Sequence, residues 1–306
     1  MKVFLTGATG FIGRYLVPAF LERGDQCTVV SRAARNPWAD PNVTVLQADP
    51  TRPGEWQRGV AGADAVVNLA GARIVHPLYR WTASRKAQLV ASRVETTHRV
   101  VEAIRAASPR PRVLVSGSAI GFYGDRGDET LDERASGGEG RGGGGDFLAG
   151  LAAAWEQAAR EARDVTRVVL FRTGLVLARD APALAPLVPL FRMGLGGSWG
   201  NGKQWWSWIH IADLVGLALL AIDEPLMGPV NVTAPAPVTV DEFADTLGAV
   251  CQRPVLFRMP ALGLRLALGE AADALLHLQR VVPAQALEAG YRFRFPALRQ
   301  ALEDLF

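Results

Sequence analysis

The chain has 306 residues, of which 49% are apolar and 21% are charged, an ordinary balance for a soluble globular protein. Its two cysteines, Cys27 and Cys251, allow no disulfide framework and no metal site built on cysteine spacing, so we expect a reducing, cytoplasmic environment. The net charge of +3 comes from arginines that are scattered along the chain, so we expect no nucleic-acid face. The longest apolar run, residues 214–222, is short, so we expect no membrane span.

Short β-branched runs alternate with longer helical patterns along the first half of the chain. Because the strand runs are apolar on both faces and the joints are short, the pattern predicts an α/β fold, a doubly wound parallel sheet of the Rossmann type. The carboxyl ends of such strands lie along one edge, where ligands bind. We expect strands at residues 2–7, 26–32, 43–49, 65–71, 112–119 and 166–174, and helices at 10–24, 53–61, 81–107 and 147–162.

The pattern changes after residue 174, where proline and glycine become frequent. Residues 205–222 read as a short strand and a helix that rejoin the sheet, and residues 234–306 as short helices. We therefore predict a cofactor-binding Rossmann domain at 1–175, with 207–233 rejoining its sheet, and a smaller, substrate-side C-terminal domain at 176–306. The segment 136–146 contains seven glycines and is expected to form a mobile loop.

Three glycines directly follow the first predicted strand, in the spacing Gly7-x-x-Gly10-x-x-Gly13. The first permits a tight turn, the second lets the backbone approach a pyrophosphate, and the third lets the helix pack close to the strand. The free N–H groups and the dipole of the following helix favour phosphate charge. The pattern predicts a dinucleotide site, to which we also assign the loop residues Thr9, Phe11 and Ile12.

The end of the second strand carries Ser31 and Arg32, with Arg35 close by and no carboxylate to hold a free ribose 2′-hydroxyl. A guanidinium pairs with a phosphate, so these residues predict NADP(H); the alternative is an exposed surface arginine. Asp49, at the end of the third strand, meets the adenine or begins a turn before Pro50. We also assign to the cofactor site Leu69, Ala70, Gly71, Arg93, Ser116 and Arg172.

The stretches TGATGFIG, NLAG at 68–71 and SGSAIGFYG at 116–124 resemble the extended short-chain dehydrogenase/reductases. Residues 80–97, 146–156, 204–214 and 231–248 resemble an atypical, nucleoside-diphosphate-sugar epimerase-like branch of the NAD-dependent epimerase/dehydratase family. Members of that branch end in a small domain of unknown role, similar to residues 255–306 here. The resemblance implies NADP(H) binding and a two-lobed fold, and it implies no single established substrate.

Most members of this superfamily transfer protons with a Tyr-x-x-x-Lys pair and hold the substrate oxygen with a serine at the end of the fifth strand. Ser118 matches the serine, but Phe147 and Leu151 stand where the pair is expected. Tyr123 is the substitute that we consider, with Lys86 or Arg93 as a cation that lowers its pKa. The alternative is a tyrosine packed against its own loop.

Two further groups of polar and aromatic residues have both a functional and a structural interpretation. His210 and Asp213 have the form of a catalytic pair, although a helix cap is the more economical role for Asp213. Lys203 and the tryptophans at 205, 206 and 208 suit an anionic, ring-bearing ligand, or else the tryptophans fill the seam between the lobes.

The sequence thus predicts an NADP(H)-dependent oxidoreductase or epimerase-like enzyme that acts on a small sugar- or nucleotide-like substrate such as a nucleotide sugar. Ser118 would hold the substrate oxygen, and Tyr123 or water would carry the proton. The missing Tyr–Lys pair favours an alternative, a non-catalytic NADPH-binding redox sensor or interaction module. We expect no metal site, and either a monomer or a homodimer.

Overall fold

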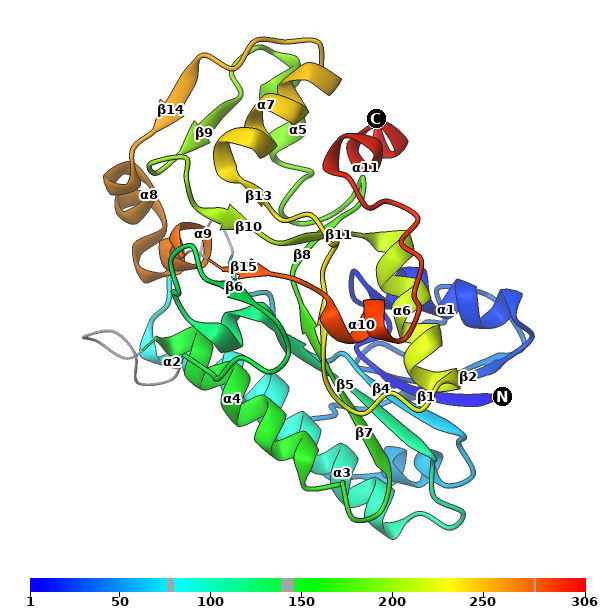
Figure 1. Ribbon diagram of the computed structural model, residues 1–306. Helices are drawn as coiled ribbons and strands as arrows, with labels where there is room; N and C mark the ends of the chain where they lie inside the picture. Colours follow the sequence, from blue (N-terminus) through cyan, green and yellow to red (C-terminus); the bar gives the residue numbers. More distant parts are fainter. Residues whose placement is uncertain (76–79, 139–145, 278) are drawn as a thin grey trace.

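The computed structural model describes residues 1–75, 80–138, 146–277 and 279–306, and a parallel sheet lies at its centre (Figure 1). Within these residues the sheet has seven strands in the order β3-β2-β1-β4-β5-β7-β12, and every neighbouring pair is parallel. The order reverses between β1 and β4, so the predicted doubly wound α/β fold is confirmed. The strands are β1 (Lys2–Thr6), β2 (Gln26–Ser31), β3 (Val43–Gln47), β4 (Ala65–Asn68), β5 (Val113–Ala119), β7 (Arg167–Thr173) and β12 (Gly228–Val232).

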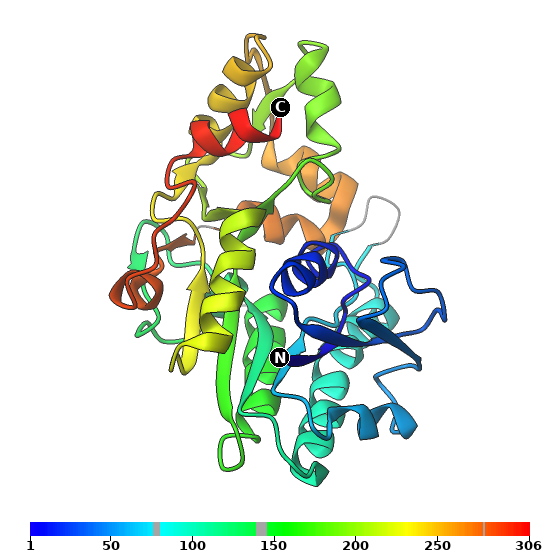
Figure 2. The ribbon, with the colours of Figure 1, turned by 90° about the vertical axis from the view of Figure 1, so that its right-hand side faces the viewer.

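Helices cover both faces of this sheet because successive strand residues point to opposite sides. In β1, Val3 and Leu5 join the core under α1 and α6, whereas Phe4 joins the core under α3 and α4. Figures 1 and 2 show these helix pairs on opposite sides of the sheet. The helices of this layer are α1 (Gly13–Glu22), η1 (Glu55–Val60), α2 (Ala83–Val90), η2 (Ala91–Glu95), α3 (Thr96–Ala106), η3 (Ile120–Tyr123), α4 (Phe147–Arg160) and α6 (Ile211–Asp223).

The helix predicted at 81–107 contains an irregularity that the sequence pattern does not reveal. Its middle, η2, is one π-helical turn between α2 and α3. A π-turn inserts an extra residue and changes the direction of the side chains around it, and such turns are frequent at functional sites. Ser92 and Arg93 lie within this turn.

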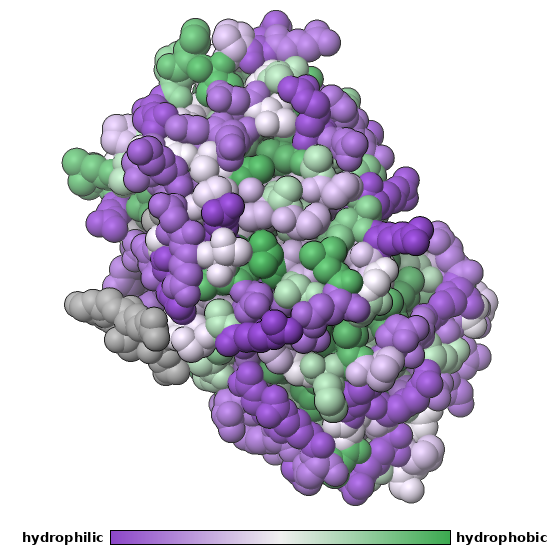
Figure 3. All heavy atoms as spheres, in the orientation of Figure 1, coloured by the Kyte–Doolittle hydropathy of each residue, from purple (hydrophilic) through white to green (hydrophobic). Residues whose placement is uncertain are grey.

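A smaller lobe stands beyond the carboxyl edge of the sheet, with the C-terminus in it (Figures 1 and 2). Figure 3 shows mostly polar side chains on one face, with apolar ones gathered over this lobe, where Leu262 and Leu266 of α8 are exposed. The lobe and its junction contain β6 (Thr130–Leu131), β8 (Leu175–Leu177), α5 (Leu187–Arg192), β9 (Gly197–Trp199), β10 (Trp205–Trp206), β11 (Trp208–His210), β13 (Val238–Thr239), α7 (Val240–Val250), β14 (Phe257–Met259), α8 (Ala261–Leu268), η4 (Gly269–Ala272), α9 (Asp273–Leu276), β15 (Arg280–Val281), α10 (Ala284–Glu288) and α11 (Leu298–Leu305).

The strand predicted near the start of 205–222 does not rejoin the main sheet. Instead, β11 pairs with β8, with Trp208 opposite Leu175, and the seventh strand of the sheet is β12. Gly174 explains the break between β7 and β8, because a Cβ atom there would lie 2.4 Å from the carbonyl oxygen of Ser207. The chain therefore leaves the sheet at this glycine and pairs with the segment that leads into α6.

The structure bears on three further features of the sequence: the glycine-rich segment, the lack of a predicted membrane span, and the two cysteines. Residues 139–145 of the glycine-rich segment lie outside the described residues, so the predicted loop at 136–146 stays a prediction. Among the described helices, none combines the length and the apolar character that a membrane crossing requires. Cys27 and Cys251 are both free thiols.

One buried carboxylate ties the C-terminal segment to the sheet domain. Asp213 in the first turn of α6 is fully buried. Its Oδ1 accepts a hydrogen bond from the backbone N–H of Arg294 at 2.7 Å, and its Oδ2 accepts one from the N–H of Phe295 at 2.9 Å. The Tyr291 hydroxyl donates a third bond to Oδ1 at 3.2 Å. Asp213 therefore anchors the chain between α10 and α11.

We predict that Asp213→Ala lowers the free energy of unfolding by about 3 kcal/mol, because two buried backbone N–H groups lose a charged acceptor. The measurement is urea unfolding followed by circular dichroism. Tyr291→Phe is the matched control, which removes only the hydroxyl and should cost about 1 kcal/mol. An Asp213→Ala protein as stable as the Tyr291→Phe protein would contradict this anchoring role.

Candidate functional site

The glycine loop after β1 is packed so closely that only glycine fits at two of its positions. Gly7 has a φ of 71°, and a Cβ atom there would lie 2.5 Å from the carbonyl carbon of Leu69. A Cβ atom on Gly13 would lie 2.2 Å from the carbonyl oxygen of Ala8. Within the loop, the N–H of Gly10 donates to the carbonyl oxygen of Gly7 at 2.9 Å. The loop therefore has the tight turn and the close helix–strand packing that its spacing predicts.

A cavity of about 1070 Å³ opens beside this loop, at the carboxyl ends of β1, β2, β3, β4, β5 and β7. The far side of the cavity is formed by the smaller lobe, through residues 205–207, 273–275, His277 and Gln279. It is therefore a site between the two lobes, at the switch point of the sheet, where doubly wound folds bind ligands.

The structure brings most of the predicted site residues together around this cavity. Three predicted residues do not line it, namely Ser116, Tyr123 and Arg172. Three basic residues named from the sequence, Arg35, Lys86 and Lys203, also lie outside the lining. The predicted residues that line it are Gly7, Thr9, Gly10, Phe11, Ile12, Gly13, Ser31, Arg32, Asp49, Leu69, Ala70, Gly71, Arg93 and Ser118.

The start of α1 and the end of β2 fit an anionic dinucleotide. The N-cap residue of α1, Ile12, gives the helix no side-chain hydrogen bond, and no acidic residue lies in its first turn. A phosphate is therefore the partner that the dipole and the free N–H groups of this turn favour. At the end of β2, Arg32 is exposed on the cavity wall.

Asp49 both lines the cavity and closes its own turn, so neither interpretation of this residue excludes the other. Its Oδ1 accepts hydrogen bonds from the backbone N–H of Thr51 at 3.0 Å and from its hydroxyl at 2.8 Å. Burial alone would raise the Asp49 pKa, but the Thr51 hydrogen bonds and nearby Arg52 and Arg32 hold it below its ordinary value.

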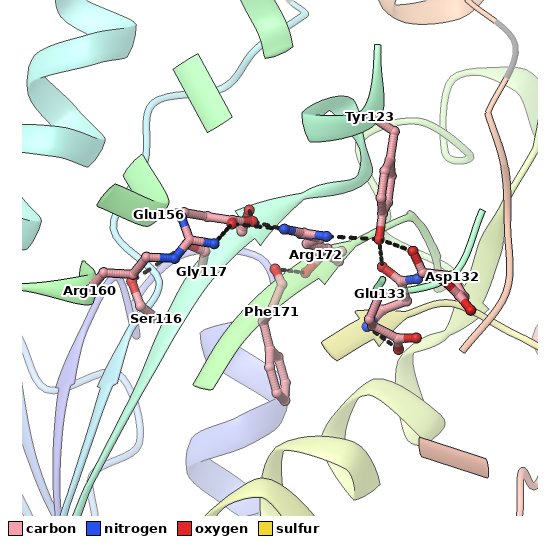
Figure 4. Close-up of polar contacts among 12 residues, drawn as sticks. Ser116, Gly117, Tyr123, Asp132, Glu133, Glu156, Arg160, Phe171 and Arg172 are labelled. Atoms are coloured by element: carbon pink, nitrogen blue, oxygen red, sulfur yellow. Dashed lines mark hydrogen bonds and ion pairs between the residues drawn. The ribbon is translucent and has the colours of Figure 1, made fainter. Parts of the chain in front are cut away.

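A buried polar network lies behind the cavity wall and explains why Arg172 and Tyr123 do not line the cavity (Figure 4). The Ser118 hydroxyl donates to Oε1 of Glu156 at 2.7 Å. Arg172 donates to both carboxylate oxygens of Glu156, through Nε at 2.7 Å and an Nη at 3.0 Å, and Arg160 adds a bond at 2.6 Å. The charge of Arg172 is thus balanced by Glu156, and this arginine does not line the cavity to which the sequence analysis assigned it.

Tyr123 is the second correction, because its side chain is fully buried and not at the ligand edge. Its hydroxyl donates to Oδ1 of Asn231 at 2.7 Å and accepts a bond from Arg172 at 3.0 Å. Burial raises the Tyr123 pKa to about 12, although Arg172 acts in the opposite direction. The cation beside it is therefore Arg172, while Lys86 pairs with Glu270.

Ser116 is the third correction. It is fully buried on β5, where the side-chain amide of Asn68 reaches its hydroxyl at 3.5 Å. Ser118 lies two residues on and lines the cavity, because it is closer to the carboxyl end of the strand.

Arg93 brings to the cavity a positive charge that pairs with no carboxylate within the part of the chain that the structure describes. Its guanidinium donates to the carbonyl oxygens of Ala72 at 2.9 Å and Leu89 at 3.3 Å, and it stacks over the Trp155 ring at 5.2 Å. Burial lowers the Arg93 pKa to about 10, and the charge of Arg85 acts in the same direction. Its hydrogen bonds within the described residues are all to neutral oxygens, so its charge is available to an anionic ligand.

Several lining residues escaped the sequence analysis. Arg73 and Arg85 lie near Arg93 on the wall, but nothing distinguishes them from the other arginines of the sequence. His277 comes from the smaller lobe, and its ring nitrogen Nδ1 lies 3.4 Å from Asp146. Asp146 stands directly before an apolar helical run, a pattern typical of an N-cap. Its contact with His277 could not be predicted in the same way, because the two residues are far apart in sequence and meet only in the folded chain.

The candidate pair His210 and Asp213 has structural roles, as its helix-cap interpretation favoured, although the cap residue is His210. Its Nδ1 accepts a hydrogen bond from the N–H of Ala212 at 3.2 Å, and its ring packs on Phe295. Burial lowers the His210 pKa, although Asp304 and Asp213 act in the opposite direction. Neither residue lines the cavity.

The tryptophans of the interlobe stretch divide between the two interpretations. Trp206 packs on Trp199 and Phe243 with ring centroids 4.7 and 4.8 Å away, and Trp208 is fully buried. Trp205 and Trp206 both line the cavity, so Trp206 fits both interpretations, and Arg280 stacks on the Trp205 ring at 4.4 Å.

Comparisons with known proteins agree with this arrangement. A model of the NAD dependent epimerase/dehydratase family matches residues 3–233, and a model of a domain of unknown function, DUF1731, matches residues 259–305. The chain is similar to the chloroplastic epimerase family protein SDR39U1 homolog of Arabidopsis thaliana, with 38% identity over 314 residues, covering 100% of this chain and 86% of the relative.

Two solved structures are also similar over the whole chain. The crystal structure of human epimerase family protein SDR39U1 (isoform 2) with NADPH has a TM-score of 0.87 and 35% identity, covering 100% of this chain and 99% of the other. That of the nucleoside-diphosphate sugar epimerase from Corynebacterium glutamicum has a TM-score of 0.78 and 30% identity, covering 100% and 58%.

His210 predicts an acid-dependent loss of stability. Because its folded-state pKa lies below its ordinary value of 6.5, the unfolded chain binds the proton first. The contribution of neutral His210 is therefore present above about pH 6.5 and is lost as the pH falls through the lower folded-state pKa. His210→Asn keeps a capping side chain but does not titrate.

The free energy of unfolding of His210→Asn should therefore fall less between about pH 7 and pH 5 than that of the wild type, as measured by urea unfolding at each pH. His98→Asn, at the surface, should keep the wild-type pH dependence. Parallel curves for His210→Asn and the wild type would show that this histidine does not titrate as proposed.

Proposed function

The chain belongs to the NAD-dependent epimerase/dehydratase family, and from this premise we propose that it binds NADP(H) and transfers hydride on a small, anionic, sugar- or nucleotide-like substrate. The observation that carries the proposal is the continuous cavity that runs from Arg32 after β2, past the glycine loop after β1, to Ser118 on β5 and the smaller lobe. It offers a place for a dinucleotide at one end and for a second ligand at the other.

The residues at the first end fit the cofactor in its phosphorylated form. Gly7, Gly10 and Gly13 let the pyrophosphate approach the backbone at the start of α1, and Arg32 would bind the 2′-phosphate. No carboxylate stands at the end of β2, where a ribose 2′-hydroxyl would need one. The human relative crystallised with NADPH supports the same assignment.

The residues at the second end favour an anionic substrate. Arg73, Arg85 and Arg93 line this part of the cavity, and Trp205 offers an aromatic face from the smaller lobe. A diphosphate or a carboxylate joined to a ring suits this combination. The relative from Corynebacterium glutamicum, whose name describes a nucleoside-diphosphate sugar epimerase, supports a nucleotide sugar.

The cofactor would supply hydride transfer, and the chain's own residues would orient the substrate oxygen. Without a ligand the Ser118 hydroxyl donates to Glu156, and because a hydroxyl hydrogen rotates about its C–O bond, it can turn to donate to a substrate oxygen instead. Glu156 then keeps its hydrogen bonds from Arg172 and Arg160, so no buried charge is left without a partner.

The second candidate is a protein that binds NADPH without turning it over. It is favoured by Phe147 and Leu151, the apolar residues of α4 where related enzymes carry a proton-transferring pair. A monomer or homodimer and a cytoplasmic location remain predictions; the Arabidopsis thaliana relative is described as chloroplastic.

Cofactor choice is tested by Arg32→Asp. We expect it to weaken NADPH binding by about 2 kcal/mol or more, roughly 30-fold, through loss of a charge-assisted bond to the 2′-phosphate, with little change for NADH. Nicotinamide fluorescence titration measures both dissociation constants. Arg35→Asp makes the same change of charge on a nearby exposed residue outside the cavity and should have a small effect on both. Equal losses for NADPH and NADH in Arg32→Asp would contradict the assignment.

Turnover is tested by following the absorbance of the reduced nicotinamide, with NADP⁺ plus nucleotide sugars and with NADPH plus small carbonyl compounds. The proposal expects a change with at least one substrate, and Ser118→Ala should reduce the rate about 100-fold while leaving the NADPH dissociation constant within about twofold. Tight NADPH binding without turnover in either panel would favour the sensor.

A further inference from the structure

His277 and Asp146 form a pair at the cavity, and the function described so far gives it no role. His277 follows α9 in the smaller lobe and lines the cavity, and Asp146 is the N-cap of α4 in the sheet domain. Their Nδ1 and Oδ2 atoms are 3.4 Å apart. Figure 1 draws α9, in orange, above the amino-terminal end of α4. The pair therefore joins the two lobes at the wall of the site.

The two oxygens of Asp146 have separate tasks. Oδ1 accepts hydrogen bonds from the backbone N–H groups of Leu148 at 2.9 Å and Ala149 at 3.3 Å, which fixes the carboxylate at the helix start. Asp146 Oδ2 and His277 Nδ1 are both buried, neither has a hydrogen-bond partner within the described part of the chain, and they face each other at the ion-pair distance of 3.4 Å. A carboxylate held in this way presents Oδ2 to the imidazole, as in catalytic histidine–carboxylate pairs.

The electrostatic surroundings of the imidazole favour its protonated form. Asp146 raises the His277 pKa more than burial lowers it, and Asp273 and Asp125 act in the same direction. Arg265 lies 3.5 Å from Asp273, so part of that charge is already balanced. A histidine that titrates at the wall of a ligand cavity can both give and take a proton near neutral pH.

The position of the pair relates it to Ser118. Asp146 directly precedes Phe147, where the family resemblance implies a proton-transferring tyrosine. The start of α4 also packs on η3, which begins two residues after Ser118: a Cβ atom on Gly121 would lie 3.5 Å from the Cβ of Leu148. The imidazole thus lines the cavity from the other lobe, and its partner Asp146 directly precedes the position of the missing tyrosine.

We propose that His277 is a catalytic residue that exchanges a proton with the substrate oxygen bound by Ser118, and that Asp146 is its positioning residue. The inference rests on the proposed function. In the oxidising direction the substrate hydroxyl proton passes to neutral His277 Nε2 as the C–H bond breaks, the hydride is accepted by the bound NADP⁺, and a carbonyl forms. In the reducing direction the imidazolium returns the proton to the carbonyl oxygen, so atoms and charges balance.

The alternative is a structural ion pair that only joins the lobes. Two variants separate the roles. Asp146→Asn keeps a good N-cap side chain for α4 and removes the negative charge. His277→Gln removes the titrating group and keeps a polar side chain of similar reach. His98→Gln is the matched control, because His98 pairs with a carboxylate, Glu161, at 3.3 Å on the surface.

The first measurement is an NMR pH titration of the histidine Cε1–H signals, which needs no turnover. The wild-type His277 pKa should lie above its ordinary value and should move down toward it in Asp146→Asn. Adding NADP⁺ with UDP-glucose or UDP-glucuronate should shift the His277 signal. The proposal is overturned if the His277 pKa is unchanged in Asp146→Asn, or if the His277 signal does not shift when NADP⁺ and the nucleotide sugar are added.

The second measurement is kinetic, with whichever substrate the wild type accepts. His277→Gln should lower kcat about 100-fold with the NADPH dissociation constant within about twofold, and Asp146→Asn should move the acidic limb of the kcat–pH profile to lower pH. Wild-type kcat in His277→Gln overturns the proposal. Failure of NADPH to bind the wild type would instead refute the proposed function, so the two failures are distinguishable.

Discussion

The site depends on one steric constraint, the contact between the glycine loop and the end of β4. The backbone of Gly7 lies so close to Leu69 that a single added carbon would come within 2.5 Å of it. Gly13 imposes a similar limit between α1 and the loop. Because both positions exclude side chains, the start of α1 faces the sheet edge with backbone N–H groups, which suits a phosphate group. The same cavity is lined by this loop, by Arg32 and by the smaller lobe.

A second constraint, the buried charge network, sets what the other end of the cavity can do. Glu156 binds Ser118, Arg160 and Arg172, and Arg172 binds Tyr123, so four polar side chains around one carboxylate are held in fixed positions. The helix that carries Glu156 faces the cavity with leucine, alanine and tryptophan side chains. Under our proposal, the group that exchanges protons with a ligand therefore comes from the smaller lobe, which places His277 at the cavity wall.

Local patterns made the fold predictable from the sequence, and they also led to the predicted cofactor residues, most of which line the cavity. The strands were visible as apolar runs, and the roles of Gly7 and Gly13 follow from their place between a strand and a helix. Arg172, Ser116 and Tyr123 were placed wrongly because their strand or loop position is local, whereas the partners that bury them are not. Arg172 is bound to Glu156 on another element, and Ser116 differs from Ser118 only by its depth along β5. His277 could not be found, because the contact that gives it meaning is with Asp146, distant in sequence.

A crystal structure of the protein with NADPH tests the central claim most directly. The account predicts the pyrophosphate against the backbone between Gly7 and Gly13, the 2′-phosphate within hydrogen-bond distance of Arg32, and the nicotinamide directed toward Ser118. A dinucleotide bound elsewhere, or one in the cavity with its adenosine end turned away from Arg32, would contradict the account.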